Sequence, residues 1–188
     1  METEATHSPL MVDRQAAILG IVDVQNKLVP VIAEVQRTID NIVKLIKLAH
    51  ILSIPIICTE QQNLGETVDA VRSEFQTWSP ITKLDFSCFA SVDFVEQLQS
   101  HQRRTLLLTG LEAHICIAQT ALAAPAPFRV QVVSDAVASR SPEDRKIALE
   151  RLRQNGVSIT STEMLMYELL QKAGTTEFRN ALPLLKNR

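Results

Sequence analysis

Cys116 is the side chain in this sequence best suited to nucleophilic attack. It follows a short apolar run over residues 104–109 and a break at Gly110, and a helical pattern begins close to it. A strand that turns sharply into a helix places such a thiol near the unpaired N–H groups of the first helical turn. That environment lowers the pKa of a thiol and favours the nucleophilic thiolate. The alternative is an inert core cysteine, because free cysteines are among the most buried residues.

Asp23 and Lys83 could supply the proton transfer and the charge that a reactive thiol needs. Asp23 lies near the end of the apolar run over residues 17–24, and Lys83 lies in a short extended piece. In doubly wound sheets, ligands bind beyond the carboxyl ends of the strands, where the strand order reverses. If the strands at 17–24 and 104–109 flank that reversal, Asp23 and Cys116 face each other. The alternatives are a strand-end cap for Asp23 and a solvated surface lysine for Lys83.

The histidines offer no convincing base for the thiol. His114 is two residues before Cys116 and cannot easily turn back onto its sulfur, and the other three fall on helices or in the N-terminal arm. The sequence also lacks the glycine-rich turn of dinucleotide-binding sheets, a P-loop and the Gly-x-Ser-x-Gly elbow of serine hydrolases. A carboxylate must therefore serve as the base, and Asp23 is the candidate.

Strands that alternate with helices predict one α/β domain, a parallel sheet with helices on both faces, over residues 13–188. Residues 1–12 are polar and predict a flexible N-terminal arm. The predicted strands cover residues 17–24, 55–60, 104–109, 129–134 (up to a carboxylate at Asp135) and 157–162, with the short piece around Lys83. The predicted helices cover residues 38–52, 67–75, 92–102, about 116 to the prolines at 125 and 127, 141–155, 163–172 and 175–185.

The composition excludes several classes of protein. The 188 residues are 46% hydrophobic and 21% charged with a net charge of −2, which excludes a disordered chain and the basic footprint of a nucleic-acid binder. No apolar run is long enough to cross a bilayer, so we expect no membrane association. The three cysteines lack the spacing of a disulfide framework or a zinc site. Without a secretory signal pattern at the N-terminus, we expect a cytoplasmic protein.

Three motifs together resemble the isochorismatase-like cysteine hydrolase superfamily, which includes nicotinamidases and related amidases. They are Ile21-Val22-Asp23-Val24-Gln25-Asn26, Thr82-Lys83-Leu84-Asp85-Phe86-Ser87 and Gly110-Leu111-Glu112-Ala113-His114-Ile115-Cys116-Ile117-Ala118-Gln119-Thr120. The third motif resembles a metal-free subgroup of isochorismatase-domain proteins. The resemblance implies a three-layer, Rossmann-like α/β sandwich with a mainly parallel sheet of six strands and the site at the strand carboxyl ends.

The resemblance also implies a catalytic triad of Asp23, Lys83 and Cys116. Cys116 would attack the amide carbonyl of a small molecule, Asp23 would carry the proton to the leaving amine, and Lys83 would balance the charge. The backbone N–H groups of Glu112 and Cys116 would hold the oxyanion. In this family a non-proline cis peptide exposes the first of these groups, here expected at Leu111–Glu112, and such a bond costs about 3–4 kcal/mol.

Differences from the nicotinamidase pattern change the expected metal content and the expected reaction. Nicotinamidases hold a metal on histidines after the second strand, whereas residues 59–63 here contain none. Because such a site depends on imidazole ligands, we expect no metal and no other cofactor. True isochorismatases cleave a vinyl ether and resemble this chain less, because they lack a cysteine at the position of Cys116. Vinyl-ether hydrolysis and a catalytically silent binding or assembly protein remain the alternatives to amide cleavage.

Two further expectations concern the substrate pocket and self-association. The expected pocket lining consists of Leu28, Gln61, Trp78, Phe86, Phe89 and Ile115. The chain also ends in leucine-rich helical segments at 165–170 and 182–185, and uncovered apolar faces often form subunit contacts. Since the family commonly forms dimers or larger rings, we expect a homo-oligomer.

Overall fold

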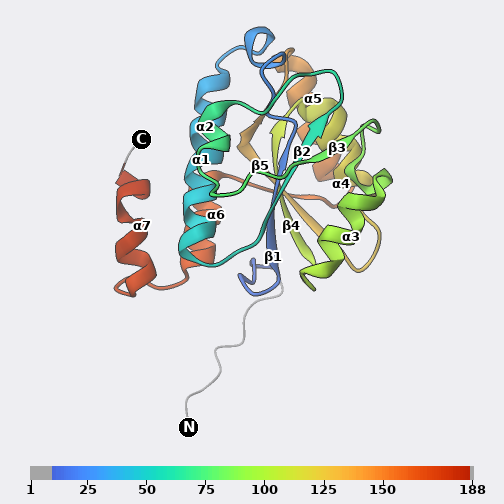
Figure 1. Ribbon diagram of the computed structural model, residues 1–188. Helices are drawn as coiled ribbons and strands as arrows, with labels where there is room; N and C mark the ends of the chain where they lie inside the picture. The colour runs from blue at the N-terminus through green and yellow to red at the C-terminus, as the bar shows by residue number, and fades with distance from the viewer. Residues whose placement is uncertain (1–9, 187–188) are drawn as a thin grey trace.

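The computed structural model describes residues 10–186, which form a six-stranded sheet with helices on both faces (Figure 1). The strands run in the order β3-β2-β1-β4-β5-β6, and every neighbouring pair is parallel. Their bounds are β1 Ala17–Val22, β2 Ile56–Gln61, β3 Ile81–Lys83, β4 Thr105–Leu111, β5 Arg129–Ala138 and β6 Ser158–Thr160. The predicted parallel α/β fold is confirmed.

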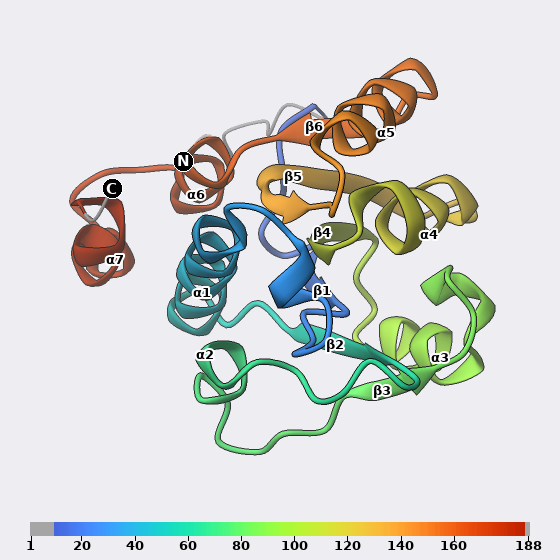
Figure 2. The ribbon, with the colours of Figure 1, turned by 90° about the horizontal axis from the view of Figure 1, so that it is seen from above.

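The helices form the two outer layers of the sandwich (Figure 2). Their bounds are α1 Val35–Ile51, α2 Asp69–Arg72, α3 Val92–Ser100, α4 Ala118–Ala123, α5 Pro142–Gln154, α6 Thr162–Leu170 and α7 Thr176–Lys186. Helices α1, α2 and α6 cover one face of the sheet, α3, α4 and α5 cover the other, and α7 lies outermost beyond α1 and α6. As capping chemistry predicts, Ser91 and Ser141 accept hydrogen bonds from the first turns of α3 and α5.

The strand order reverses between β1 and β4, which is the crevice where the sequence places the chemistry. The two strands stay in register to their carboxyl ends, where Val22 pairs with Gly110. Gly110 has a φ of 134°, and a Cβ atom there would lie 2.0 Å from the carbonyl oxygen of Val22. This close approach admits only glycine, which explains the break between the strand and the helical pattern.

Three local predictions are wrong. Strand β5 continues past Asp135 to Ala138, because an irregularity shifts its pairing with β4 and lets the strand resume. The turn after β4 becomes helical at Ala113, as a π turn over Ala113–Ile117, so Cys116 lies one turn inside the helical segment. Val12 belongs to the core rather than to an arm, since it is 1% exposed and its N–H donates to the Glu168 carboxylate.

Residues 1–9 of the predicted arm lie outside the described residues. The leucines of α6 are buried against α1 and the sheet, so they leave no uncovered leucine face. The large apolar side chains that α6 does expose are Met164 and Tyr167. No helix within residues 10–186 is long and apolar enough to span a membrane.

Candidate active site

The carboxyl ends of β1, β3 and β4 bring the three predicted catalytic residues to one edge of the sheet. Asp23 follows β1 directly, Lys83 is the last residue of β3, and Cys116 lies in the π turn after β4. Asp23 has a left-handed φ of 55°, a conformation in which aspartate is enriched. All three residues are buried, with exposures of 1%, 3% and 6%.

Asp23 and Lys83 form a buried ion pair that is saturated with hydrogen bonds. The Lys83 ammonium donates to Oδ2 of Asp23 at 2.7 Å, and both side chains are at most 1% exposed. The hydroxyl of Thr59 donates to Oδ1 at 2.8 Å. Lys83 also donates to Oε1 of Gln61 at 2.7 Å and to the carbonyl oxygen of Asp85 at 3.3 Å. These bonds offset the desolvation that makes a buried ion pair costly.

The charge on Lys83 is secured by its partner. Burial is the largest single effect and works to lower the pKa of Lys83, but the charge and hydrogen bond of Asp23 together with Cys116 and Cys88 outweigh it, so the net pKa is raised. Lys83 therefore stays protonated at neutral pH and places a fixed positive charge beside Cys116. A fixed cation at this place can stabilise a thiolate or a developing oxyanion.

The environment of Cys116 corrects the expectation of a low thiol pKa. Burial raises the pKa of Cys116, and the charge of Asp23 raises it further, while Lys83 opposes both. The helical segment does not overcome these effects, so the resting residue is a neutral thiol beside the Asp23 carboxylate. Such a thiol can attack only if a base removes its proton during the attack, and Asp23 is placed to do so.

Sequence reasoning missed a second thiol at this edge. Cys88 is fully buried, and its backbone N–H donates to the hydroxyl of Thr120, one turn after Cys116. Burial raises the pKa of Cys88 to about 11, with Lys83 opposing the shift. No spacing in the sequence indicates this proximity, because it depends on how the turn over residues 88–90 packs on the helical segment.

The predicted cis peptide at Leu111–Glu112 is wrong. Among residues 10–186 the cis bond is Ala126–Pro127. The chain leaves β4 by a left-handed residue at Glu112 (φ 58°, ψ 62°) that follows the positive φ of Gly110, and this pair makes the turn without a cis bond. The oxyanion role of the backbone N–H groups of Glu112 and Cys116 stays a prediction.

The side chain of Glu112 has a structural role, because it holds the turn after β4 in place. Its buried carboxylate lies 3.3 Å from Nδ1 of His114 and 3.4 Å from Nε of Arg140. Nδ1 of His114 also lies 3.0 Å from the hydroxyl of Ser139. The cluster links the turn that holds Cys116 to the loop between β5 and α5.

The structure does not bring the predicted pocket residues together. Leu28 and Trp78 belong to the core on the α1 side of the sheet, whereas Phe89 and Ile115 pack against the core on the opposite side. Phe86 is 53% exposed. Of the predicted lining, Gln61 contacts the triad, through Lys83.

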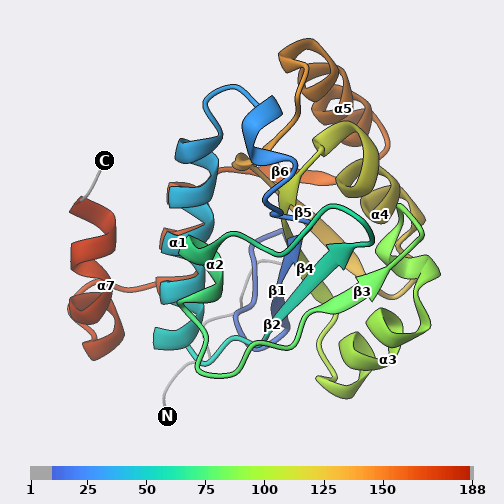
Figure 3. The same cartoon turned by 45° about the horizontal axis from the view of Figure 1, so that its top comes forward.

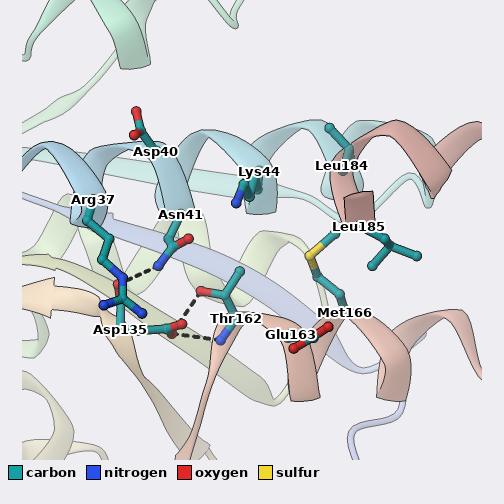
Figure 4. Close-up of a pocket in the computed structure, with 10 residues that line it drawn as sticks. All are labelled: Arg37, Asp40, Asn41, Lys44, Asp135, Thr162, Glu163, Met166, Leu184 and Leu185. Carbon is teal, nitrogen blue, oxygen red and sulfur yellow. Dashed lines mark hydrogen bonds between the residues drawn. The ribbon is translucent and has the colours of Figure 1, made fainter. Parts of the chain in front are cut away.

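Two hollows of the surface lie away from the triad and share Arg37 and Asp135. The first, of about 820 Å³, is drawn in Figure 4. It is lined by Arg37, Asp40, Asn41, Lys44, Asp135, Thr162, Glu163, Met166, Leu184 and Leu185. The second, of about 520 Å³, lies between the start of α1 and the start of α5. Within the described part of the chain, no three His, Cys, Asp or Glu side chains are grouped to hold a metal ion.

Comparisons with family models and with known sequences identify the same family. The family model described as the isochorismatase domain matches residues 16–164. The chain is 34% identical to isochorismatase family protein 1A of Dictyostelium discoideum, over 92% of this chain and 87% of that protein. It is 36% identical to isochorismatase domain-containing protein 2 of Danio rerio, over 91% and 87%.

Solved structures agree with the fold. The MAR1 ribonuclease of Caenorhabditis elegans superposes with a TM-score of 0.86 at 31% identity, covering 93% of this chain and 92% of that one. The YcaC gene product of Escherichia coli, described as an octameric hydrolase of unknown specificity, gives a TM-score of 0.85 at 24% identity over 97% and 96%. The second likeness concerns the fold alone.

Proposed function

The chain belongs to the isochorismatase family, and we propose that it is a cysteine hydrolase that cleaves the C–N bond of a small amide. One observation carries the proposal: a buried, fully hydrogen-bonded Asp23–Lys83 pair faces the buried thiol of Cys116. A carboxylate beside the thiol can act as a base, and the neighbouring ammonium can stabilise negative charge. Together, the Cys116 thiol, the Asp23 carboxylate and the Lys83 ammonium supply a nucleophile, a base and a positive charge for acyl transfer.

In the first half-reaction, the sulfur of Cys116 attacks the amide carbon while Asp23 takes the thiol proton. The raised pKa of the thiol requires that these two events be coupled, because a free thiolate is scarce at neutral pH. The tetrahedral intermediate then collapses, and the C–N bond breaks as Asp23 returns its proton to the leaving nitrogen. Ammonia or an amine departs and leaves a thioester on Cys116.

In the second half-reaction, water attacks the thioester carbon. Asp23, again a carboxylate, accepts a proton from the water and delivers it to the sulfur as the C–S bond breaks. The product is a carboxylic acid, and the site returns to the thiol and carboxylate. Lys83 keeps its proton throughout, so it balances the charge of Asp23 without entering the proton transfer.

Other activities make different demands on the site. Vinyl-ether hydrolysis of the isochorismate type needs no nucleophile, so it should survive in Cys116→Ala. The name of the Caenorhabditis elegans relative is that of a ribonuclease, and RNA cleavage is therefore an outcome to test. A silent binding protein would turn over none of these substrates.

Ammonia release from a panel of small carboxamides tests the proposal. We expect turnover of at least one carboxamide by the wild type and none by Cys116→Ala, with Cys58→Ala as the control because Cys58 is a buried cysteine outside the site. Parallel assays with isochorismate and single-stranded RNA cover the alternatives. Full activity of Cys116→Ala on the same carboxamide would overturn the proposed function.

We also propose that the protein self-associates. The exposed apolar side chains of α6, Met164 and Tyr167, support this in place of the buried leucines. Light scattering at micromolar concentration should give at least a dimer, which Tyr167→Glu weakens. A monomeric wild type would overturn this part of the proposal.

A further inference from the structure

Strand β2 contributes no member of the triad, although it lies between the two strands that hold Asp23 and Lys83 (Figure 3). Its Thr59 pairs with the last residue of β1, Val22, and its Gln61 pairs with Lys83 itself. Because Thr59 and Gln61 are two residues apart, their side chains lie on the same face of the sheet. The middle strand therefore reaches both halves of the ion pair.

Thr59 holds the carboxylate of Asp23 from one side. It is 1% exposed, its hydroxyl donates to Oδ1 of Asp23 at 2.8 Å, and its carbonyl oxygen accepts the N–H of Asp23 at 3.2 Å. The ammonium of Lys83 occupies Oδ2 at 2.7 Å. With a separate donor on each oxygen, the carboxylate cannot rotate without losing a buried hydrogen bond. Its orientation toward Cys116 is thereby fixed.

Gln61 holds the ammonium of Lys83 in the same way. Its Oε1 accepts from Nζ at 2.7 Å, while its Nε2 donates to the carbonyl oxygen of Leu84 at 2.7 Å, and the second bond defines which end of the amide faces the lysine. The backbone of Gln61 is anchored in turn by Gln25, whose Oε1 accepts the N–H of Gln61 and whose Nε2 donates to its carbonyl oxygen. Gln25 is fully buried.

We propose that Thr59 and Gln61 are positioning residues, which act through Asp23 and Lys83 to set the proton transfer from Cys116. The inference rests on the proposed function, because it concerns the reaction in which Asp23 serves as the base. A preorganised pair needs no rearrangement when charge develops in the transition state.

Other groups facing Asp23 must be considered in a pH experiment. They are Lys83 of β3, Cys116 of the turn after β4 and Cys88 of the turn over Cys88–Ala90. Thr59→Val and Thr59→Ser keep all three side chains, but Thr59→Val also removes the hydrogen bond between Thr59 and Cys88, which Thr59→Ser retains. Thr109 supplies a matched control, because it is a fully buried threonine of the neighbouring β4 that donates to the carbonyl oxygen of Gly20 instead.

The test compares kcat, KM and the pH profile of amide hydrolysis in these variants. Thr59→Val should lower kcat by about 10²-fold with little change in KM, because a small misplacement of a catalytic group has an effect of that order. The pH profile of its kcat/KM should change with it, and Thr59→Ser should restore both. Gln61→Met should lower kcat in the same way, while Thr109→Val should leave the profile in place.

Alkylation of Cys116 by iodoacetamide, followed by mass spectrometry, separates this inference from the proposed function. Its rate against pH should differ between the wild type and Thr59→Val, and Thr59→Ser should restore the wild-type curve, whether or not a substrate is known. If the wild type hydrolyses amides and Thr59→Val shows unchanged kcat and an unchanged profile, the inference is wrong. If no amide is hydrolysed but the alkylation curves differ as expected, the proposed function fails and the positioning role stands.

Discussion

The edge of the sheet that holds Asp23, Lys83 and Cys116 and the hollow between α1, α6 and α7 differ in almost every physical respect. The edge has almost no exposed area, and its polar atoms bond to one another. The hollow is open, with a volume of about 820 Å³ and several charged side chains around it (Figure 4). Size alone would point to the hollow as the functional site.

The bonding pattern points the other way. In the hollow, Oδ1 of Asp135 accepts from the N–H and hydroxyl of Thr162, and the side chain of Asn41 donates to the carbonyl oxygen of Asp135. These contacts hold α1, β5 and α6 together, so the polar groups of the hollow have a structural role. At the edge, an ammonium and a carboxylate are buried beside a thiol, and buried titratable groups gathered in this way are typical of functional sites. Buried polar groups that hydrogen-bond to one another therefore identify the candidate site better than the volume of a hollow does.

Removing a charge at the edge should give the largest effect. Lys83→Met should abolish turnover and lower the free energy of unfolding by about 3–5 kcal/mol, because it leaves Asp23 charged and unpaired in the core. Lys44→Met, in the hollow, should change stability by no more than about 0.5 kcal/mol and leave turnover intact. Urea unfolding and ammonia release measure the two quantities.

A double variant sharpens that result. Asp23→Asn combined with Lys83→Met should recover part of the lost stability, because no charge is then left unpaired, yet turnover should stay absent. Equal stability of Lys83→Met and the wild type would contradict the buried ion pair.

The two aspartates provide the next comparison. Asp23→Asn should lower kcat by about 10²–10⁴-fold, the usual contribution of a general base. Asp135→Asn should keep kcat and lose about 1–3 kcal/mol of stability, because it weakens two bonds to Thr162. Steady-state kinetics and urea unfolding of both variants decide the matter. A kinetic defect in Asp135→Asn as large as that in Asp23→Asn would remove the distinction between the two regions.

Much of the fold could be predicted because it follows from local patterns. Apolar runs marked the strands, helical spacing marked α1, and serine caps marked the starts of α3 and α5. The condition under which Asp23 and Cys116 face each other, that β1 and β4 flank the strand reversal, is met by the sheet order. These features depend on residues close together in the sequence or on general rules for parallel sheets.

The remaining features depend on contacts between distant segments. Thr59 reads as an ordinary strand residue, and Gln61 as a pocket residue without a link to Lys83, until β2 is known to lie between β1 and β3. The raised pKa of Cys116 reflects burial and a neighbouring carboxylate, which a helix-start argument cannot weigh. The scattered pocket residues show the same limit, because an apolar side chain carries no sign of which core it joins.

Alkaline pH should produce the smallest of these effects, and part of it should come from the Cys88 thiol at the buried edge. Burial raises the pKa of Cys88 from 9.0 to about 11 in the folded protein, so the stability it supports is fully present below pH 9 and is lost as pH rises toward 11. The loss should reach at most about 1.4 kcal/mol per pH unit for this thiol. Urea unfolding at pH 8, 9 and 10 should show a shallower decline in Cys88→Ala. Parallel curves for the two proteins would contradict the buried state of this thiol.

Trapping the acyl group is the most direct test of the central claim, that Cys116 forms a thioester during amide hydrolysis. The wild type is mixed with a carboxamide that it turns over, quenched in acid and analysed by peptide mass spectrometry. We expect an added acyl mass on the peptide that contains Cys116. Hydroxylamine should remove this mass, and it should be absent from Cys116→Ala. Turnover that persists in Cys116→Ala, or an acyl group found on another residue, would contradict it.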